Sequence, residues 1–258
     1  MCRTLLVTLV MCFATLPVHA INFQDLWWNK SESGWGVNIA QQADILFATW
    51  FIYGPNRDPY WVVMPGSTRL STGANVYQGT LYQTRGTHYP SVPFVPLTGM
   101  DVTPVGSATF DFTDTKSGTL TYTINNQTVI KQIERQFIAK LSPSGTFYGG
   151  FYKSATGCTN DTLNGSRQSN SIYVLSSGAN SSLTINEIGG DNCRFTGSFT
   201  QYGSLFEGTG TYTCLGATGS WTGSEGRLMD ANFSMKLSLT QSGETCTIAG
   251  SIGGFNPQ

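Results

Sequence analysis

Charged side chains, histidines and long apolar runs are all scarce in this sequence of 258 residues. Asp, Glu, Lys and Arg make up 11% of the chain, against about a quarter in an average globular protein. Lys and Arg form no cluster, which argues against nucleic acid and anionic membranes as partners. No run approaches the roughly 20 apolar residues that a membrane-spanning helix needs, so we expect no transmembrane segment.

Motifs for catalysis and for cofactors are also missing. The chain has no GxSxG nucleophile elbow, no HExxH zinc motif, no phosphate-binding loop and no dinucleotide fingerprint. Beyond residue 20 the single histidine is His88, in the segment THYPSVPFVP, which is typical of a surface loop. We therefore predict no catalytic residue, no cofactor and no metal site.

Paired carboxylates remain as an alternative, because a glycoside hydrolase needs two of them on either side of the scissile bond. The pairs that lie closest in the sequence are Glu187 with Asp191 and Glu225 with Asp230. Each pair is more typical of a solvated turn than of a catalytic site.

The first twenty residues predict export. Arg3 is the only charged residue among them, an apolar stretch runs from Leu5 to Val18, and small residues stand where a signal peptidase cleaves, at Val18-His19-Ala20. Cleavage near Ile21 removes one of the 14 basic residues and none of the 15 acidic ones, which leaves a net charge of −2. We expect a periplasmic or secreted protein.

Four cysteines remain after this cleavage, and an even number in an oxidising compartment predicts two disulfides. If the strands of the second half run up and down in sequence order, all four lie at one end. Closure of an eight-stranded barrel would bring Cys158 toward Cys246, while Cys193 and Cys214 belong to neighbouring strands of one hairpin. We favour these two pairings among the three connectivities that four cysteines allow.

Apolar and polar residues alternate with period two, and Gly, Asn, Asp or Pro interrupts the pattern every eight to twelve residues, which predicts an all-β protein. In the first half the expected strands are Gly34 to Gln42, Ile45 to Tyr53, Tyr60 to Met64, Val76 to Thr84, Ser107 to Asp111, Thr119 to Ile124 and Val129 to Phe137. In the second half they are Thr146 to Tyr152, Ser171 to Leu175, Ser182 to Ile188, Cys193 to Gln201, Leu205 to Cys214, Gly216 to Trp221, Ala231 to Leu239 and Thr245 to Ile252. A loop between the fourth and fifth strands contains Pro90, Pro93, Pro96 and Pro104.

The composition changes near the polar segment 141–145, and this change predicts two domains. Five of the six tryptophans precede that segment, and all four mature cysteines follow it. The predicted organisation is a signal peptide over 1–20, a Trp-rich antiparallel β-domain over 21–140 and a disulfide-containing domain over 145–258. The second domain is expected to be an up-and-down barrel or a sandwich.

The segment 25–67 is unusually aromatic and gives the candidate binding surface. Pairing its first two strands across the Ala43-Asp44 turn sets large rings on one face beside small residues, with Phe51 opposite Gly36. Such a face forms a shallow groove for a flat or extended ligand, unless another part of the chain fills it. If Tyr60 lies opposite Tyr53 after a six-residue loop, it joins the same face. The predicted ligand-binding residues are Asn38, Phe47, Phe51, Tyr53 and Tyr60.

The phrases SGWG, LFATWF, PYWVVM and YQGTLY occur in this order within residues 31–86. This segment resembles a group of exported bacterial proteins of uncharacterised function. The resemblance implies a secreted or periplasmic protein, and it assigns no activity to any residue.

Together these features favour a non-catalytic exported binding protein whose ligand is a glycan or a small apolar molecule. The first alternative is a module that binds protein, as an envelope structural protein or an enzyme inhibitor. The second is a hydrolase that depends on carboxylates.

Overall fold

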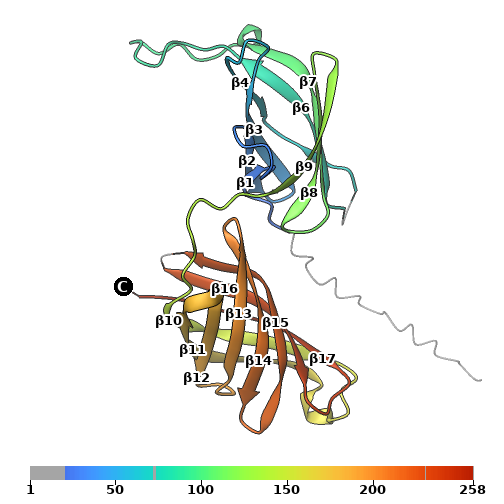
Figure 1. Cartoon of the computed structure of the whole chain (residues 1–258), viewed down its shortest axis with the longest axis vertical. Helices are drawn as coiled ribbons and strands as arrows, with labels where there is room; N and C mark the ends of the chain where they lie inside the picture. The colour runs from blue at the N-terminus through green and yellow to red at the C-terminus, as the bar shows by residue number, and fades with distance from the viewer. Residues whose placement is uncertain (1–20, 72–73, 230, 258) are drawn as a thin grey trace, which may run out of the picture.

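The computed structural model describes residues 21–71, 74–229 and 231–257. Two antiparallel β-barrels lie end to end in it, with the first barrel at the top of Figure 1. The predicted all-β fold with two antiparallel domains is therefore confirmed. The helices of this part of the chain are three-residue 3-10 turns, η1 (Gly99–Asp101), η2 (Asp161–Leu163) and η3 (Ala179–Ser181), and none has the length or apolar character to cross a membrane. The predicted signal peptide lies outside the described residues.

The first barrel is a sheet in the order β4-β3-β2-β1-β9-β8-β7-β6-β5. A pairing of Val63 in β4 with Tyr82 in β6 closes this sheet on itself, so that β5 is left as a short extension beside β6. The strands are β1 (Asp25–Trp28), β2 (Gly36–Gln42), β3 (Ile45–Tyr53), β4 (Pro59–Met64), β5 (Thr68–Arg69), β6 (Val76–Thr84), β7 (Val102–Phe112), β8 (Ser117–Ile124) and β9 (Gln127–Arg135).

Aromatic side chains dominate the interior of the first barrel. The period-two pattern of β3 turns Leu46, Ala48 and Trp50 inward, where all three are fully buried. Phe23, which precedes β1, stacks on Phe112 of β7 with ring centroids 3.9 Å apart. Burial of rings of this size supplies much of the apolar area that stabilises the domain.

The second barrel is a closed meander in which each strand pairs with its sequence neighbours and the last pairs with the first. Its strands follow the predicted order, although most are longer than predicted. They are β10 (Gly145–Ala155), β11 (Gly165–Ser177), β12 (Ser182–Ile188), β13 (Arg194–Tyr202), β14 (Leu205–Cys214), β15 (Ala217–Met229), β16 (Asn232–Gln241) and β17 (Thr247–Phe255). The segment between Arg135 and Gly145 connects the two barrels (Figure 1).

The four cysteines stand in or beside the connections β10–β11, β12–β13, β14–β15 and β16–β17, which share the end of the second barrel opposite the β13–β14 turn. The disulfides join Cys158 to Cys246 and Cys193 to Cys214, which are the pairings that the strand order favours. Such bonds are typical of an oxidising, extracytoplasmic compartment. The opposite end of this barrel contacts the first one, where Ser204 in the β13–β14 turn donates a backbone hydrogen bond of 2.9 Å to Asp25.

Candidate functional site

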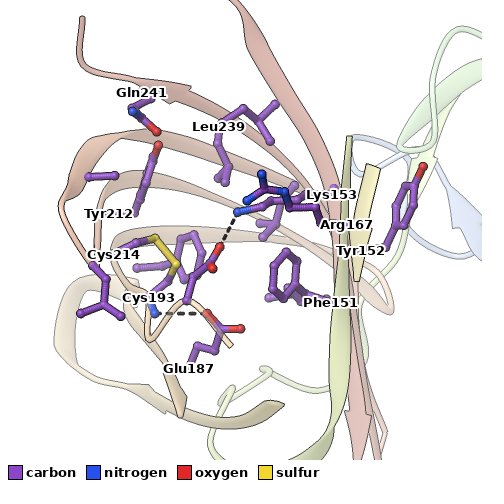
Figure 2. Close-up of a pocket in the computed structure, with 18 of the residues that line it drawn as sticks. Phe151, Tyr152, Lys153, Arg167, Glu187, Cys193, Tyr212, Cys214, Leu239 and Gln241 are labelled. Carbon is purple, nitrogen blue, oxygen red and sulfur yellow. Dashed lines mark hydrogen bonds and ion pairs between the residues drawn. A yellow bond between two sulfur atoms is a disulfide. The ribbon is translucent and has the colours of Figure 1, made fainter. Parts of the chain in front are cut away.

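A cavity of about 200 Å³ lies inside the second barrel, at the same end as the disulfides (Figure 2). Inward-facing side chains from several strands form its apolar walls. Among them are Phe151 of β10, Phe195 of β13, Leu237 of β16 and Ile252 of β17. The half of the barrel nearer the first domain is filled with larger rings, including Phe147, Phe206 and Phe233, which stand near the ends of β10, β14 and β16 on that side. Because these rings close one half and leave the other open, the cavity is a pocket and not a channel.

A carboxylate lies among these apolar walls. Strand β12 turns Leu183, Ile185 and Glu187 inward in succession, so Glu187 occupies a position that the alternation reserves for a core residue. Glu187 is only 6% exposed. Its Oε1 accepts a hydrogen bond of 2.7 Å from the Ser171 hydroxyl, and its Oε2 accepts one of 3.1 Å from the Cys193 backbone N–H.

The environment of Glu187 shifts the pKa of its carboxyl upward. Burial raises the pKa of this carboxyl, and the nearby charge of Asp191 raises it further. The hydrogen bonds from Ser171 and Cys193, together with the charge of Lys153, oppose this shift of the pKa without cancelling it. Raised carboxyl pKa values of this kind are concentrated at functional sites, although structural networks produce them as well.

Tyr173 of β11 lines the same cavity and pairs in register with Glu187. The ring is fully buried, and the hydroxyl lies near that of Ser171 but makes no hydrogen bond of normal geometry to any residue that the structure describes. Burial, with a smaller contribution from the charge of Glu187, raises the pKa of Tyr173 well above its ordinary value, and the nearby Ser171 hydroxyl opposes this shift without cancelling it. The phenol therefore keeps its proton over the physiological range and has a hydrogen available for an acceptor.

Charged groups of both signs line the outer part of the cavity. The ammonium group of Lys153 forms an ion pair with the carboxylate of Asp191, and Arg167 lies beside them (Figure 2). The disulfide between Cys193 and Cys214 also belongs to the lining. An apolar interior with a polar opening is the usual design of a small-molecule pocket.

The structure separates the two carboxylate pairs considered from the sequence. Glu187 and Asp191 line one cavity, and the expectation that Glu187 solvates a turn is wrong, because an inward position of β12 buries it. Glu225 instead forms an ion pair of 2.6 Å with Lys236. Its predicted neighbour Asp230 lies outside the described residues.

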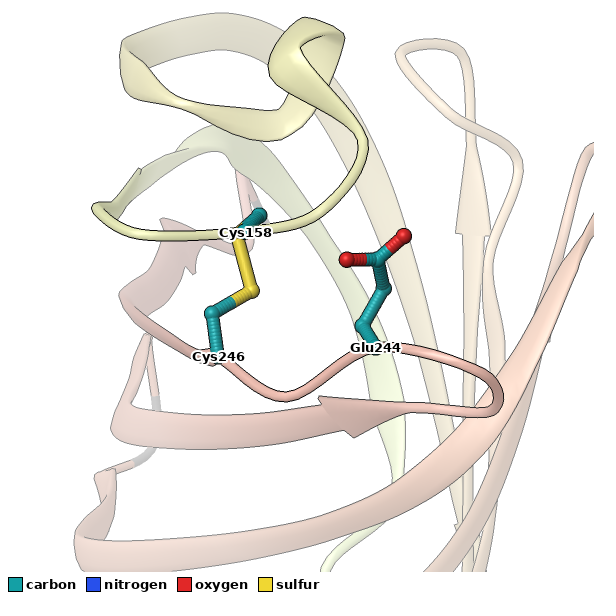
Figure 3. Close-up of side chains that lie close together, drawn as sticks. All are labelled: Cys158, Glu244 and Cys246. Atoms are coloured by element: carbon teal, nitrogen blue, oxygen red, sulfur yellow. A yellow bond between two sulfur atoms is a disulfide. The ribbon is translucent and has the colours of Figure 1, made fainter.

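A group of potential metal ligands lies beside one disulfide (Figure 3). It consists of Cys158, Glu244 and Cys246, whose ligand atoms are within 4.8 Å of one another. The two sulfur atoms are bonded to each other, and the Glu244 carboxylate accepts hydrogen bonds from the backbone N–H groups of Thr159 at 2.8 Å and Asn160 at 3.2 Å. This arrangement ties the β16–β17 turn to the loop after β10, which gives Glu244 a structural role.

The aromatic face predicted on the first barrel is partly present. Strands β2 and β3 pair in the register expected from the sequence, with Phe51 opposite Gly36 and Phe47 opposite Ala40. Asn38, Phe47, Phe51 and Tyr53 are all exposed on this outer face. Among the described residues, the rings of this face line none of five cavities, and Asn38 lines a shallow one together with Ser204 and Arg227 of the second barrel.

The placement of Tyr60 on this face is wrong. Pro59 lies opposite Tyr53, so the β3–β4 register differs by one residue from the expected one. This shift turns Tyr60 toward the core, where it is half-buried, and places Trp61 outward, 52% exposed and opposite Phe51. A shift of one residue exchanges the two faces of a strand. Trp61, which the sequence pattern would assign to the core, therefore belongs to the exposed aromatic face.

Replacing the buried carboxyl should change how stability depends on pH. Because the folded state raises the pKa of Glu187, it holds this proton more tightly than the unfolded chain does. The free energy of unfolding should therefore decrease as the pH rises from the ordinary carboxyl pKa of about 4.3 through the raised value. In Glu187→Gln that decrease should be absent. Urea unfolding of the wild type and of Glu187→Gln between pH 4 and 8 measures the two free energies of unfolding. If their difference does not vary with pH, the pKa of Glu187 is not raised in the folded protein.

Comparisons with known proteins place few constraints on the function. No family model matches the chain, and neither does any curated protein. Among solved structures, the chain is similar to a crystal structure of a "putative outer membrane protein" from Bacteroides fragilis, with a TM-score of 0.32 and 10% sequence identity over 91% of this chain and 96% of that one. A similarity this low carries no argument about function. The resemblance of residues 31–86 to exported bacterial proteins stays a prediction.

Proposed function

We propose that this protein is a non-catalytic, exported binding protein, and that the second barrel holds a small, mostly apolar molecule. The apolar cavity with its polar opening is the observation that carries this proposal. A cavity of about 150 Å³ lined by aliphatic and aromatic side chains is known to accept benzene. A volume of about 200 Å³ therefore suits a molecule built on one ring.

The state of Asp191 supports binding over hydrolysis. A glycosidase of the two-carboxylate type needs one free acid and one free base or nucleophile facing the substrate. Here Asp191 is paired with Lys153, so it is not a free base or nucleophile. The apolar walls also provide few partners for the many hydroxyl groups of a sugar.

Filling the cavity should abolish binding of an apolar probe. Leu239 lines the cavity and is only half-buried, so Leu239→Trp adds a ring there with little strain on the interior. Toluene, titrated while amide and methyl NMR shifts are recorded, should shift the signals of residues such as Ile252 and Phe195 in the wild type. The same titration should leave the NMR shifts of Leu239→Trp unchanged.

Phe51→Ala provides the matched control for this experiment, because it removes an exposed ring from the aromatic face of the first barrel and leaves the cavity intact. Toluene binding should survive this substitution. Two results together would overturn the proposal and place the ligand on the first barrel. The first is that the wild type is retained on polysaccharides and Phe51→Ala is not. The second is that toluene shifts no NMR signals of the wild type.

A further inference from the structure

Two buried polar residues of the cavity lie on neighbouring strands and at the same level of the barrel. Tyr173 and Glu187 are direct partners in the pairing of β11 with β12, and both turn inward. Direct partners across an antiparallel pair have Cβ atoms about 4.5–5.5 Å apart. One functional group of a ligand can therefore reach both side chains.

Their hydrogen-bonding capacities are complementary. The Tyr173 hydroxyl is fully buried and makes no hydrogen bond to a described residue, so its hydrogen is available for an acceptor. Each oxygen of Glu187 accepts one hydrogen bond, from Ser171 or from the Cys193 N–H, and each has capacity for another. Leaving a buried donor unpaired destabilises the folded protein, so a ligand that pairs it is favoured.

A hydroxyl group satisfies both side chains at once, because it accepts from Tyr173 and donates to Glu187. A ligand carboxylate has no hydrogen for an ionised Glu187 and is repelled by its negative charge. A ligand ammonium group has no lone pair for the Tyr173 hydrogen. Other walls of the cavity, among them Phe195, Leu237 and Ile252, are apolar and suit a hydrocarbon ring.

We infer that the cavity selects a small ring-bearing alcohol or phenol, whose hydroxyl bridges Tyr173 and Glu187 while its ring packs against the apolar walls. This inference rests on the proposed binding function and assigns the ligand class to it. Tyr173 is then a specificity-determining residue, since an isosteric hydrocarbon would leave its hydroxyl unpaired.

Benzyl alcohol and ethylbenzene provide the test, because they have nearly the same shape and differ in the hydroxyl. Their dissociation constants should be measured by NMR titration for the wild type and for Tyr173→Phe. The preference for benzyl alcohol over ethylbenzene should decrease about tenfold in Tyr173→Phe, which corresponds to the loss of one hydrogen bond.

Tyr77→Phe is the matched control. Tyr77 is also fully buried with a hydroxyl that has no described partner, but it belongs to the core of the first barrel and does not line the cavity. Its substitution should leave the preference between the two probes unchanged. Both tyrosine variants remove only an unpaired hydroxyl, so both should unfold cooperatively, as thermal denaturation would show.

The outcomes distinguish this inference from the function on which it rests. If both probes bind and the preference is the same in the wild type and in Tyr173→Phe, the hydroxyl assignment is overturned and the binding function stands. If neither probe shifts the signals of the cavity residues, both proposals are overturned. A decrease in preference that appears equally in Tyr77→Phe would also overturn the assignment.

Discussion

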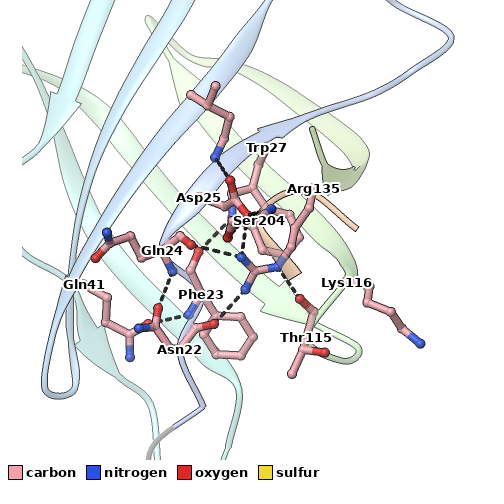
Figure 4. A network of polar contacts seen from close by, with 12 residues as sticks. Asn22, Phe23, Gln24, Asp25, Trp27, Gln41, Thr115, Lys116, Arg135 and Ser204 are labelled. Atoms are coloured by element: carbon pink, nitrogen blue, oxygen red, sulfur yellow. Dashed lines mark hydrogen bonds and ion pairs between the residues drawn. The ribbon is translucent and has the colours of Figure 1, made fainter. Parts of the chain in front are cut away.

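Arg135→Ala should lower the free energy of unfolding of the first barrel by about 3–5 kcal/mol, the range found when one partner of a buried ion pair is removed. The Arg135 side chain is fully buried, and its Nη1 lies 2.9 Å from Oδ2 of Asp25 (Figure 4). Removing the guanidinium group leaves the carboxylate of Asp25, which is only 11% exposed, without its cation.

The guanidinium group also connects segments that are distant in the sequence. It donates hydrogen bonds to the backbone carbonyls of Asn22, Gln24 and Thr115, and it lies over the ring of Trp27 at 4.9 Å. Each of these carbonyls would lose a partner in Arg135→Ala, and unpaired buried carbonyls are costly.

Lys131→Ala is the matched control, because Lys131 lies on the same strand and pairs with Glu32 in a more exposed position. Ion pairs near the surface stabilise proteins little, so this variant should lose much less stability. Urea unfolding, followed by the fluorescence of the first-barrel tryptophans, measures both. Equal losses in the two variants would show that the buried pair has no special role.

Replacing Cys158 and Cys246 by alanine should destabilise the second barrel by about 4–5 kcal/mol, and replacing Cys193 and Cys214 should cost about 3 kcal/mol. The first bond joins residues separated by 88 positions and the second joins residues separated by 21. The larger loop gains more freedom in the unfolded chain when its bond is absent, which explains the order.

The first barrel contains neither bond and should be indifferent to both double substitutions. Hydrogen exchange followed by mass spectrometry separates the two barrels, since peptides from residues 145–257 should lose protection while those from 21–135 keep it. Equal loss of protection in both barrels would mean that they unfold as one cooperative unit. A larger effect of the Cys193–Cys214 pair would contradict the loop-length argument.

Local alternation was sufficient to predict much of the fold. In the hairpin of β2 and β3, the inward series of Leu46, Ala48 and Trp50 and the short turn after Gln42 fix both the faces and the register. In the second half, eight alternating segments with short turns define the meander, and this order brings the cysteines together in pairs.

Other elements depend on information that is not local. Strand β1 is only four residues long and pairs with β2 on one side and β9 on the other. So short a segment has too little alternation to predict a strand. Pro104, predicted in a loop, lies in β7 opposite Tyr82, where a register shift after Leu81 interrupts the ladder. Prolines are tolerated in strands at such irregularities.

The error at Tyr60 has a similar origin. The turn after Tyr53 closes with a hydrogen bond from the Gly54 N–H to the Asp58 carbonyl, and Arg57 adopts a φ of 66°. This geometry makes the connection between β3 and β4 one residue shorter than expected. The alternation of residues in β4 does not specify the length of that connection. The cavity could not be predicted from the sequence, because its walls come from strands that are distant in the chain. One sequence feature did indicate it, since Glu187 stands at an inward position of a correctly predicted strand.

Gly203 at the tip of the β13–β14 turn bears on how the whole molecule moves. Its φ is +58°, and a Cβ there would lie 2.5 Å from Oδ2 of Asp25 and 2.8 Å from Cβ of Arg135. The turn therefore fits against the other barrel only because this residue has no side chain. The cavity opens at the far end, so a ligand can enter and leave without separating the barrels. Rotational tumbling in solution should then be that of one elongated particle, with or without ligand.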